Sequence, residues 1–258
     1  MSHLFNLSRF GRLFSKHTIE HWSGYLLATG VLLGGLGLVL GGAAYLSSSS
    51  LPPLEQAAFF ILGLFGAGSF FTSTVFASFG DKKQATAELM LPASHWEKYL
   101  VGWLYSLPIF LAVYIGCFYL VDSLVLQFDS YEGPPSQLVQ LFSGEEKLYT
   151  SLVAYAAVNG VFLWGSIFFV KQHFVRTAFG VLLGTVVLVA LNFKAMQALM
   201  GHELKTVVPF SSMSLHEGKE WYAINLPEAQ RAWLVLVLLG LMLLAWAAAY
   251  VRLKEKQI

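Results

Sequence analysis

Few side chains in this sequence are of a type and spacing that could do chemistry. His17 and His21 stand four residues apart, a spacing that places both rings on one side of a helix and can hold a metal ion. They do not form an HExxH motif, so we interpret both as histidines that face solvent or lipid headgroups. Ser69, in the stretch GAGSFF, has no histidine at membrane depth to activate it as a nucleophile. We therefore expect no enzyme activity, no metal and no cofactor on this chain.

Two strips of mildly polar side chains recur at helical spacing in otherwise apolar stretches. They are Ser69, Thr72, Ser73 and Phe76 in one stretch, and Asn159 and Ser166 in another. Each strip falls on one face of a helix. Such strips either hydrogen-bond between helices or line a pathway for an amphipathic solute, and both interpretations stay open here.

The elements that carry these residues are membrane spans. Of the 258 residues, 56% are hydrophobic and 12% charged, and the mean hydropathy is +0.62, which excludes an ordinary soluble domain. Runs of about 20 apolar residues, the length that crosses a bilayer, predict helices rather than the short strands of a membrane barrel. The six predicted spans cover residues 24–46, 56–78, 98–123, 148–170, 175–195 and 230–251. We predict an all-α integral membrane protein in which residues 1–258 form a single domain.

Ionisable residues avoid the centres of these spans. Those nearest to the spans sit at or beside an end: Glu55, Asp122, Lys147, Lys171, Lys194 and Arg231. Because ion-coupled transport generally uses ionisable groups at depth, this distribution argues against a proton pump or a sodium symporter. The seven histidines likewise flank the spans or lie in loops, which argues against a membrane cytochrome with haem ligands inside the bundle.

The distribution of Lys and Arg predicts the orientation. Eleven of the 16 lie on the side that holds both termini and five on the other, which places both termini in the cytoplasm. Residues 1–23 alternate apolar and basic side chains, as in an amphipathic helix lying in the membrane interface. On the outer side, residues 196–229 form a long segment. Short helices that dip into the outer leaflet are one arrangement open to it, and the sequence does not decide whether it re-enters the membrane. The sequence has no basic stripe with interleaved aromatic residues, so we do not expect it to bind nucleic acid.

Small residues form a seam along the first span. Gly30, Gly34, Gly37 and Gly41 share one face, and Gly180 and Gly184 repeat the pattern in the fifth span. Such seams favour close helix packing, either within one subunit or between two.

The cytoplasmic connection between the second and third spans is specifically punctuated. Asp81 and Gln84 have the spacing of a capping box, which starts a short helix, and Pro92 ends that helix. Ser94 and Glu97 form a second capping box, which starts the third span. The product is a helix of about ten residues held between two spans. It serves either as a chain reversal or as a receiver of mechanical input from a cytoplasmic partner.

Residues 89–104, LMLPASHWEKYLVGWL, resemble the LPAS-x-x-EK segment of permease subunits in ABC exporters of the type-two class, particularly a group common in Bacteroidetes-like bacteria. The layout is similar too, with an amphipathic start, six spans and a coupling helix between the second and third. The resemblance implies a subunit in the bacterial inner membrane that works with a second permease copy and a cytoplasmic ABC ATPase. The chain has no GxxxxGK[ST] loop, so ATP and Mg²⁺ would bind to that ATPase.

The resemblance also assigns roles to residues. The expected ATPase-coupling residues are Asp81, Lys82, Lys83, Gln84, Glu88, Leu91, Pro92, Ser94, Glu97 and Lys98. The second and fifth spans would face the dimer axis, which makes the strip of the second span a candidate for lining the pathway. Asn159 and Ser166, in the fourth span, are pathway candidates from their spacing. The alternative function is a non-transporting membrane scaffold that anchors an ATPase or another complex.

Overall fold

Six helices in the computed structural model of the chain are long and apolar enough to cross a membrane, as predicted. The structure describes residues 5–47, 51–77, 93–128, 137–142, 148–200, 204–207, 213–217, 220–224 and 228–255. The predicted coupling helix, residues 81–91, lies outside these residues and stays a prediction.

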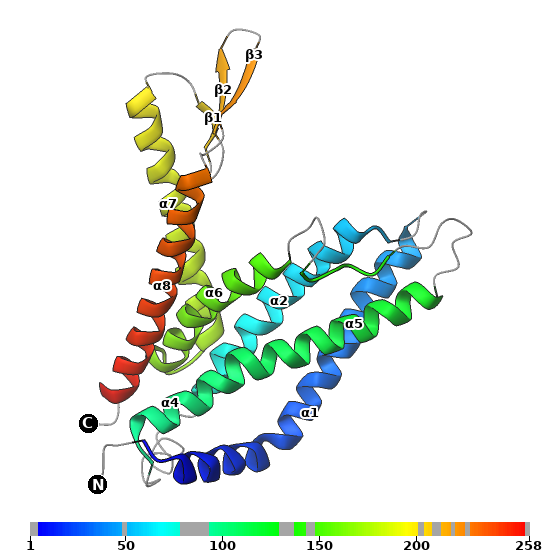
Figure 1. Cartoon of the computed structure of the whole chain (residues 1–258), viewed down its shortest axis with the longest axis vertical. Helices are drawn as coiled ribbons and strands as arrows, with labels where there is room; N and C mark the ends of the chain where they lie inside the picture. Colours follow the sequence, from blue (N-terminus) through cyan, green and yellow to red (C-terminus); the bar gives the residue numbers. More distant parts are fainter. Residues whose placement is uncertain are drawn as a thin grey trace.

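Each predicted span corresponds to a helix in the structure. The helices are α1 (Leu7–Leu46), α2 (Pro53–Val75), α4 (His95–Leu104) continuing through η2 (Tyr105–Ile109) into α5 (Phe110–Phe128), α6 (Tyr149–Phe168), α7 (His173–Met200) and α8 (Glu228–Glu255). Figure 1 shows the two ends of the chain near the same end of the bundle, as an even number of spans requires.

α1 is one unbroken helix of 40 residues, whereas we predicted an interfacial helix over residues 1–23 and a separate span from residue 24. The predicted break is wrong, because no proline interrupts this stretch and the hydrogen-bond ladder continues through it. The helix bends instead. Figure 1 shows its first part crossing the end of the bundle and the rest running beside α5. Asn6 caps the start, since its side-chain oxygen accepts a hydrogen bond from the amide of Ser8 at 2.9 Å.

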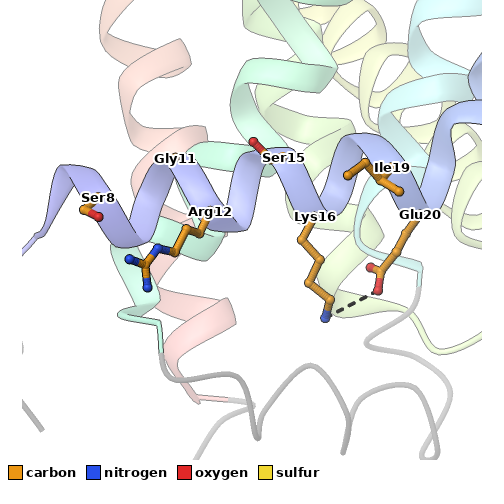
Figure 2. Close-up of a pocket in the computed structure, with 7 residues that line it drawn as sticks. All are labelled: Ser8, Gly11, Arg12, Ser15, Lys16, Ile19 and Glu20. Carbon is orange, nitrogen blue, oxygen red and sulfur yellow. Dashed lines mark ion pairs between the residues drawn. The ribbon is translucent and has the colours of Figure 1, made fainter.

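The first part of α1 has an inward face and an outward face. Phe14 is half-buried on the inward face and stacks on Tyr105, with 5.2 Å between ring centroids. The outward face is exposed, and a shallow hollow on it is lined by Ser8, Gly11, Arg12, Ser15, Lys16, Ile19 and Glu20 (Figure 2). Phe14, an apolar residue of the predicted interfacial helix, therefore packs on the protein. The membrane-interface location of this segment stays a prediction.

The core of the bundle is aromatic. Phe60 packs edge-on against Tyr114 and Phe118, with ring centroids 5.3 and 5.0 Å apart, and all three side chains are fully buried. Gly68 on α2 makes room for Tyr155 of α6, because a Cβ at this glycine would overlap the tyrosine ring. Single glycines at such points, rather than the predicted seams, allow the helices to approach closely in this chain.

The predicted glycine seams are not packed within the chain. No heavy atom of the described residues lies within 4 Å of where a Cβ would be at Gly30, Gly34, Gly37 or Gly41. The same is true of Gly180 and Gly184 on α7. Of the two kinds of packing that we considered for the seams, the structure excludes close packing within one subunit among these residues.

The third span contains a π-helical turn, η2, which we did not anticipate. Pro108 lies inside this turn. Proline has no amide hydrogen, and its ring clashes with the carbonyl four residues earlier. The α-helical hydrogen-bond ladder therefore cannot continue undisturbed. The carbonyl of Ser106 is used elsewhere, since it accepts hydrogen bonds from Tyr155 Oη at 3.2 Å and from Asn159 Nδ2 at 3.1 Å. The turn thus connects the third span to α6.

Residues 204–224 contain a small antiparallel sheet, with strands β1 (Leu204–Val207), β2 (Met213–Glu217) and β3 (Glu220–Ile224) in that order. Short helices that dip into the outer leaflet were one arrangement open to this segment, but its described residues between 204 and 224 form strands. β2 and β3 pair from Met213↔Ile224 to Glu217↔Glu220, which leaves two residues to join them, a length typical of tight hairpins. Figure 1 shows the sheet beyond the ends of α7 and α8, at the end of the molecule opposite to the termini.

Candidate coupling site at the start of the third span

The predicted capping box at the start of α4 is confirmed. Ser94 has an extended backbone, and its Oγ accepts a hydrogen bond from the amide of Glu97 at 3.2 Å. In return, Glu97 Oε2 accepts a hydrogen bond from the amide of Ser94 at 2.9 Å. Pro92 and residues 78–91 lie outside the described residues. The two bonds fix the orientation of Ser94 relative to the first turn of α4.

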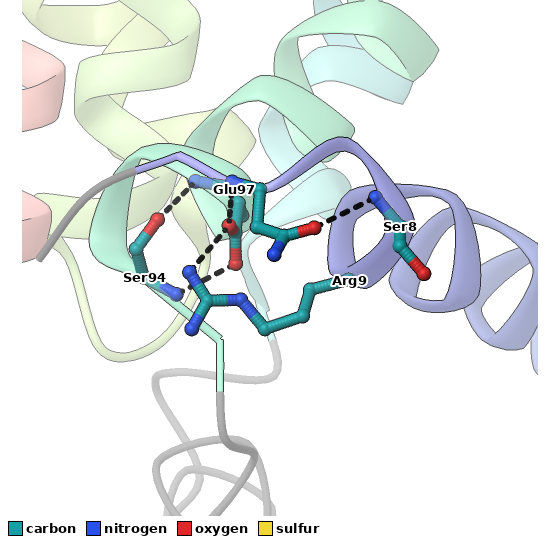
Figure 3. A network of polar contacts seen from close by, with 5 residues as sticks. Ser8, Arg9, Ser94 and Glu97 are labelled. Carbon is teal, nitrogen blue, oxygen red and sulfur yellow. Dashed lines mark hydrogen bonds and ion pairs between the residues drawn. The ribbon is translucent and has the colours of Figure 1, made fainter. Parts of the chain in front are cut away.

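Glu97 also binds the start of α1. Its second oxygen, Oε1, accepts a hydrogen bond from the amide of Asn6 at 2.8 Å and pairs with Arg9 Nη2 at 3.1 Å (Figure 3). The Glu97 side chain is fully buried, whereas that of Arg9 is 31% exposed. Burying a carboxylate is costly unless its charge is paired and hydrogen-bonded, and the guanidinium and two backbone amides meet that need. One side chain therefore joins the amino-terminal helix to the corner that precedes the third span.

Sequence reasoning missed Asn6 and Arg9 as partners of Glu97. A capping box is a local motif, so its own spacing reveals Ser94 and nothing else. The only available signal was that a glutamate next to a membrane span needs a cation, and several basic residues could have supplied it. Lys98, another predicted coupling residue, is 7% exposed, and its amide donates to the carbonyl of Ser94 at 3.1 Å.

α1 contacts the third span at a second level, around Tyr105. The Tyr105 hydroxyl and Thr18 Oγ1 are 2.5 Å apart and share a hydrogen bond. The Tyr105 ring stacks between Phe14 and Tyr25, with centroid distances of 5.2 and 5.1 Å. Tyr105 is the first residue of η2, so the first part of α1 is attached both to the start of the third span and to its π-helical turn.

His17 and His21 belong to this second contact. Their rings stack at 4.4 Å, and His17 Nε2 and the Tyr25 hydroxyl lie 2.7 Å apart in a hydrogen bond. His17 also packs against Tyr105, at 4.7 Å between ring centroids. Among the described residues, no group of three or more His, Cys, Asp or Glu side chains could hold a metal ion.

The polar strips of α2 and α6 meet inside the bundle. Asn159 Nδ2 donates to Thr72 Oγ1 at 2.9 Å, and the Thr72 hydroxyl lies 3.3 Å from that of Tyr155. Of the two interpretations of these strips, hydrogen bonding between helices is the one that the structure shows for Thr72 and Asn159. The pathway role stays a prediction for both.

The other residues of the strips do not join this network. Ser73 and Ser166 are buried and donate to carbonyls of their own helices, those of Phe70 and Leu163 respectively. Ser69 is 5% exposed on α2. Phe76, at the end of α2, is parallel to Tyr99 at 6.4 Å and packs directly over Gly102. All six side chains are thus buried within a single chain.

Comparisons of this chain with protein-family models, with curated proteins and with solved structures find no match. The likeness to type-two ABC exporter permeases therefore rests on residues 89–104 and on the order of the helices.

Proposed function

We propose that this chain is the membrane-spanning permease subunit of an ATP-driven ABC exporter in a bacterial inner membrane. It would pair with a second permease copy and with a separate cytoplasmic ATPase, which binds ATP and Mg²⁺. The six helices long enough to cross a membrane support this proposal, as does the segment that resembles the LPAS-x-x-EK signature. Both termini would lie in the cytoplasm, and the solute would be amphipathic.

The observation that carries the proposal is the double attachment at Glu97. A partner that pushes on residues 81–91 would displace the chain at Ser94, where the capping box begins. Glu97 is bonded both to that corner and to the start of α1, so a displacement of the corner would move the first and third spans together. A chain reversal without a mechanical role would not need the bonds to Asn6 and Arg9.

The decisive experiment combines this chain with the ATPase encoded next to it. The pair should copurify and hydrolyse ATP in lipid vesicles, and hydrolysis should respond to an amphiphilic dye that the vesicles then accumulate. Glu97→Gln should keep insertion and hydrolysis but reduce dye movement roughly tenfold, because it removes a charge-assisted contact worth about 1.5–3 kcal/mol. Failure of any ATPase to bind the chain would exclude the proposal.

Glu20→Gln is the matched control for Glu97→Gln. Glu20 lies in the first part of α1, the segment that Glu97 binds, but its pair with Lys16, at 3.5 Å, is between side chains that are 49% and 42% exposed. Exposed pairs contribute little, so Glu20→Gln should behave as the unmodified protein. Equal transport by both variants would show that Glu97 does not couple the ATPase to the spans.

A second candidate function, a membrane scaffold for an ATPase, is favoured by the burial of both polar strips. The side chains that we expected to line a pathway are inside the packed bundle, and Asn159 Nδ2 donates a hydrogen bond to Thr72 Oγ1 there. A scaffold would bind the ATPase stably and allow hydrolysis, yet no solute from a panel of amphiphiles would move or change the hydrolysis rate.

A further inference from the structure

Asp122 on α5 is an ionisable side chain inside the bundle that the proposed function does not use. Its exposed fraction is 0%, although it lies near the outer end of the span. Among the described residues, neither of its carboxylate oxygens has a hydrogen-bond partner and no ion pair includes it. From the sequence we expected a charge at the end of a span; the structure shows a carboxyl group enclosed by protein.

The absence of partners for Asp122 is not typical of this end of the bundle. Gln56 is also fully buried there, and its side chain is completely satisfied. Its Nε2 donates to the carbonyls of Leu51 and Gln137 at 3.0 and 3.2 Å, and its Oε1 accepts from the amide of Val139 at 2.9 Å. The fold thus surrounds a neutral amide with partners and leaves a carboxyl group bare.

A buried carboxylate without hydrogen-bond donors or a counter-charge is unstable, because it has lost the water that solvated its charge and the protein supplies no interaction instead. Ionisable groups persist in such positions where they bind a proton, an ion or a counter-charge. Since the described residues supply no counter-charge, the charge on Asp122 must be neutralised by something that is not part of that region of the chain.

Tyr119 is a titratable neighbour of Asp122 on α5. It lies three residues earlier on the same side of the helix, and its hydroxyl donates to the carbonyl of Val139 at 2.8 Å. Tyr119 and residues 137–142 line a shallow hollow on the surface of the protein, so Asp122 lies about one helical turn from this hollow. The titratable side chains of Tyr45, Glu55 and Tyr149, also at this end, are exposed.

We propose that Asp122 is a binding site for a single small cation, which enters from the outer side and neutralises the buried carboxylate. The described residues offer no second carboxylate or histidine in a group of three, so the site does not suit a tightly held transition metal. A proton and an alkali or alkaline-earth ion share the required chemistry, which is positive charge accepted by a carboxylate oxygen. This site does not depend on whether the chain is an exporter.

The test measures the thermal stability of the purified chain in lipid nanodiscs, without any ATPase. Melting temperatures are recorded across pH 5–9 in a choline buffer, and again with added NaCl or CaCl₂ at constant ionic strength. If the cation is a proton, the wild type should lose several degrees as the pH rises, because deprotonation leaves a bare buried charge, and neither salt should matter. If it is a metal ion, the salt should restore stability at high pH.

Asp122→Asn should abolish both dependences, because the amide has the same shape without the charge. Glu55→Gln, which removes an exposed carboxylate at the same end, should retain them. The proposal is overturned if Asp122→Asn follows the wild-type profile. Should that variant fail to fold, the infrared carboxyl band of wild-type protein with ¹³C-labelled aspartate decides: a buried aspartate ionised in every buffer, and unaffected by the salts, would also overturn it.

Discussion

Glu97 and Asp122 are both fully buried carboxylic side chains, and they differ in what surrounds them. Glu97 is bonded to the amides of Ser94 and Asn6 and to the guanidinium of Arg9. Asp122 has no donor near either oxygen among the described residues. The carboxylate of Glu97 is paired and hydrogen-bonded to groups of both helices, so its role is structural or mechanical. The carboxyl group of Asp122 remains available to a cation from outside the chain.

The close approach of α2 to α6 predicts a specific sensitivity at Gly68. Gly68→Ala should destabilise the protein by about 1–3 kcal/mol, because its methyl group would overlap the ring of Tyr155, which is itself fully buried and cannot move freely. Gly66→Ala, on the same helix, meets no heavy atom within 4 Å and should be neutral or slightly stabilising. Chemical unfolding in detergent measures both variants, and equal effects would contradict this account of the packing.

At the scale of elements, the first part of α1 and the start of the third span form one unit. The contacts at Glu97 and at Tyr105 lie about two helical turns apart along the third span, so they fix both the position and the direction of the first part of α1. The π-helical turn begins at Tyr105. Because π-helical turns interrupt the regular ladder, a movement of α1 would bend the third span there most easily.

Loss of the contact at Tyr105 should release the first part of α1 while the contact at Glu97 remains. Tyr105→Ala removes two ring stackings and the hydrogen bond to Thr18, a combined loss of about 2–4 kcal/mol. Amide hydrogen exchange in residues 13–22 should then accelerate at least tenfold, with no change in α6. Tyr149→Ala is the control, since Tyr149 is 43% exposed. Unchanged exchange in residues 13–22 would mean that Tyr105 does not hold α1.

At the scale of the whole molecule, the helices are unequally covered by their own chain. In the most apolar windows of α7 and α8 only 6% of residues are buried, against 44% in α6. α6 is therefore the centre of one half of the bundle, packed by α2, α7 and α8, and the outer helices present apolar surfaces to lipid or to a second copy.

Five of the six spans separate the first part of α1 from the small sheet, so the two should lie on opposite sides of the membrane. Two variants test this in a Cys117→Ala background: Ser8→Cys, on the exposed outward face of α1, and Thr206→Cys, in β1. In intact cells, a membrane-impermeant maleimide should label the second and not the first; in inverted vesicles the result should reverse. The wild-type chain should not react, because its only cysteine is buried. Labelling of both from one side would contradict the six-span topology.

The sequence by itself determined the parts of this protein that depend on short stretches of chain. The length of the apolar stretches predicted the six spans, because a helix satisfies its own backbone hydrogen bonds inside a bilayer. The spacing of Ser94 and Glu97 predicted a capping box, because both partners belong to one helical turn. The predicted end of a helix at residue 23 was wrong, since nothing local there breaks the ladder.

Only the tertiary structure decided which distant groups satisfy one another. Arg9 and Glu97 are 88 residues apart, and Thr72 and Asn159 are 87 apart, so no spacing in the sequence links them. The same applies to Asp122: its position near a span end was plain, but its isolation from every donor among the described residues depends on how the outer ends of several helices pack. Local motifs are set by chain geometry, whereas the partner of a buried polar group is set by the fold that encloses it.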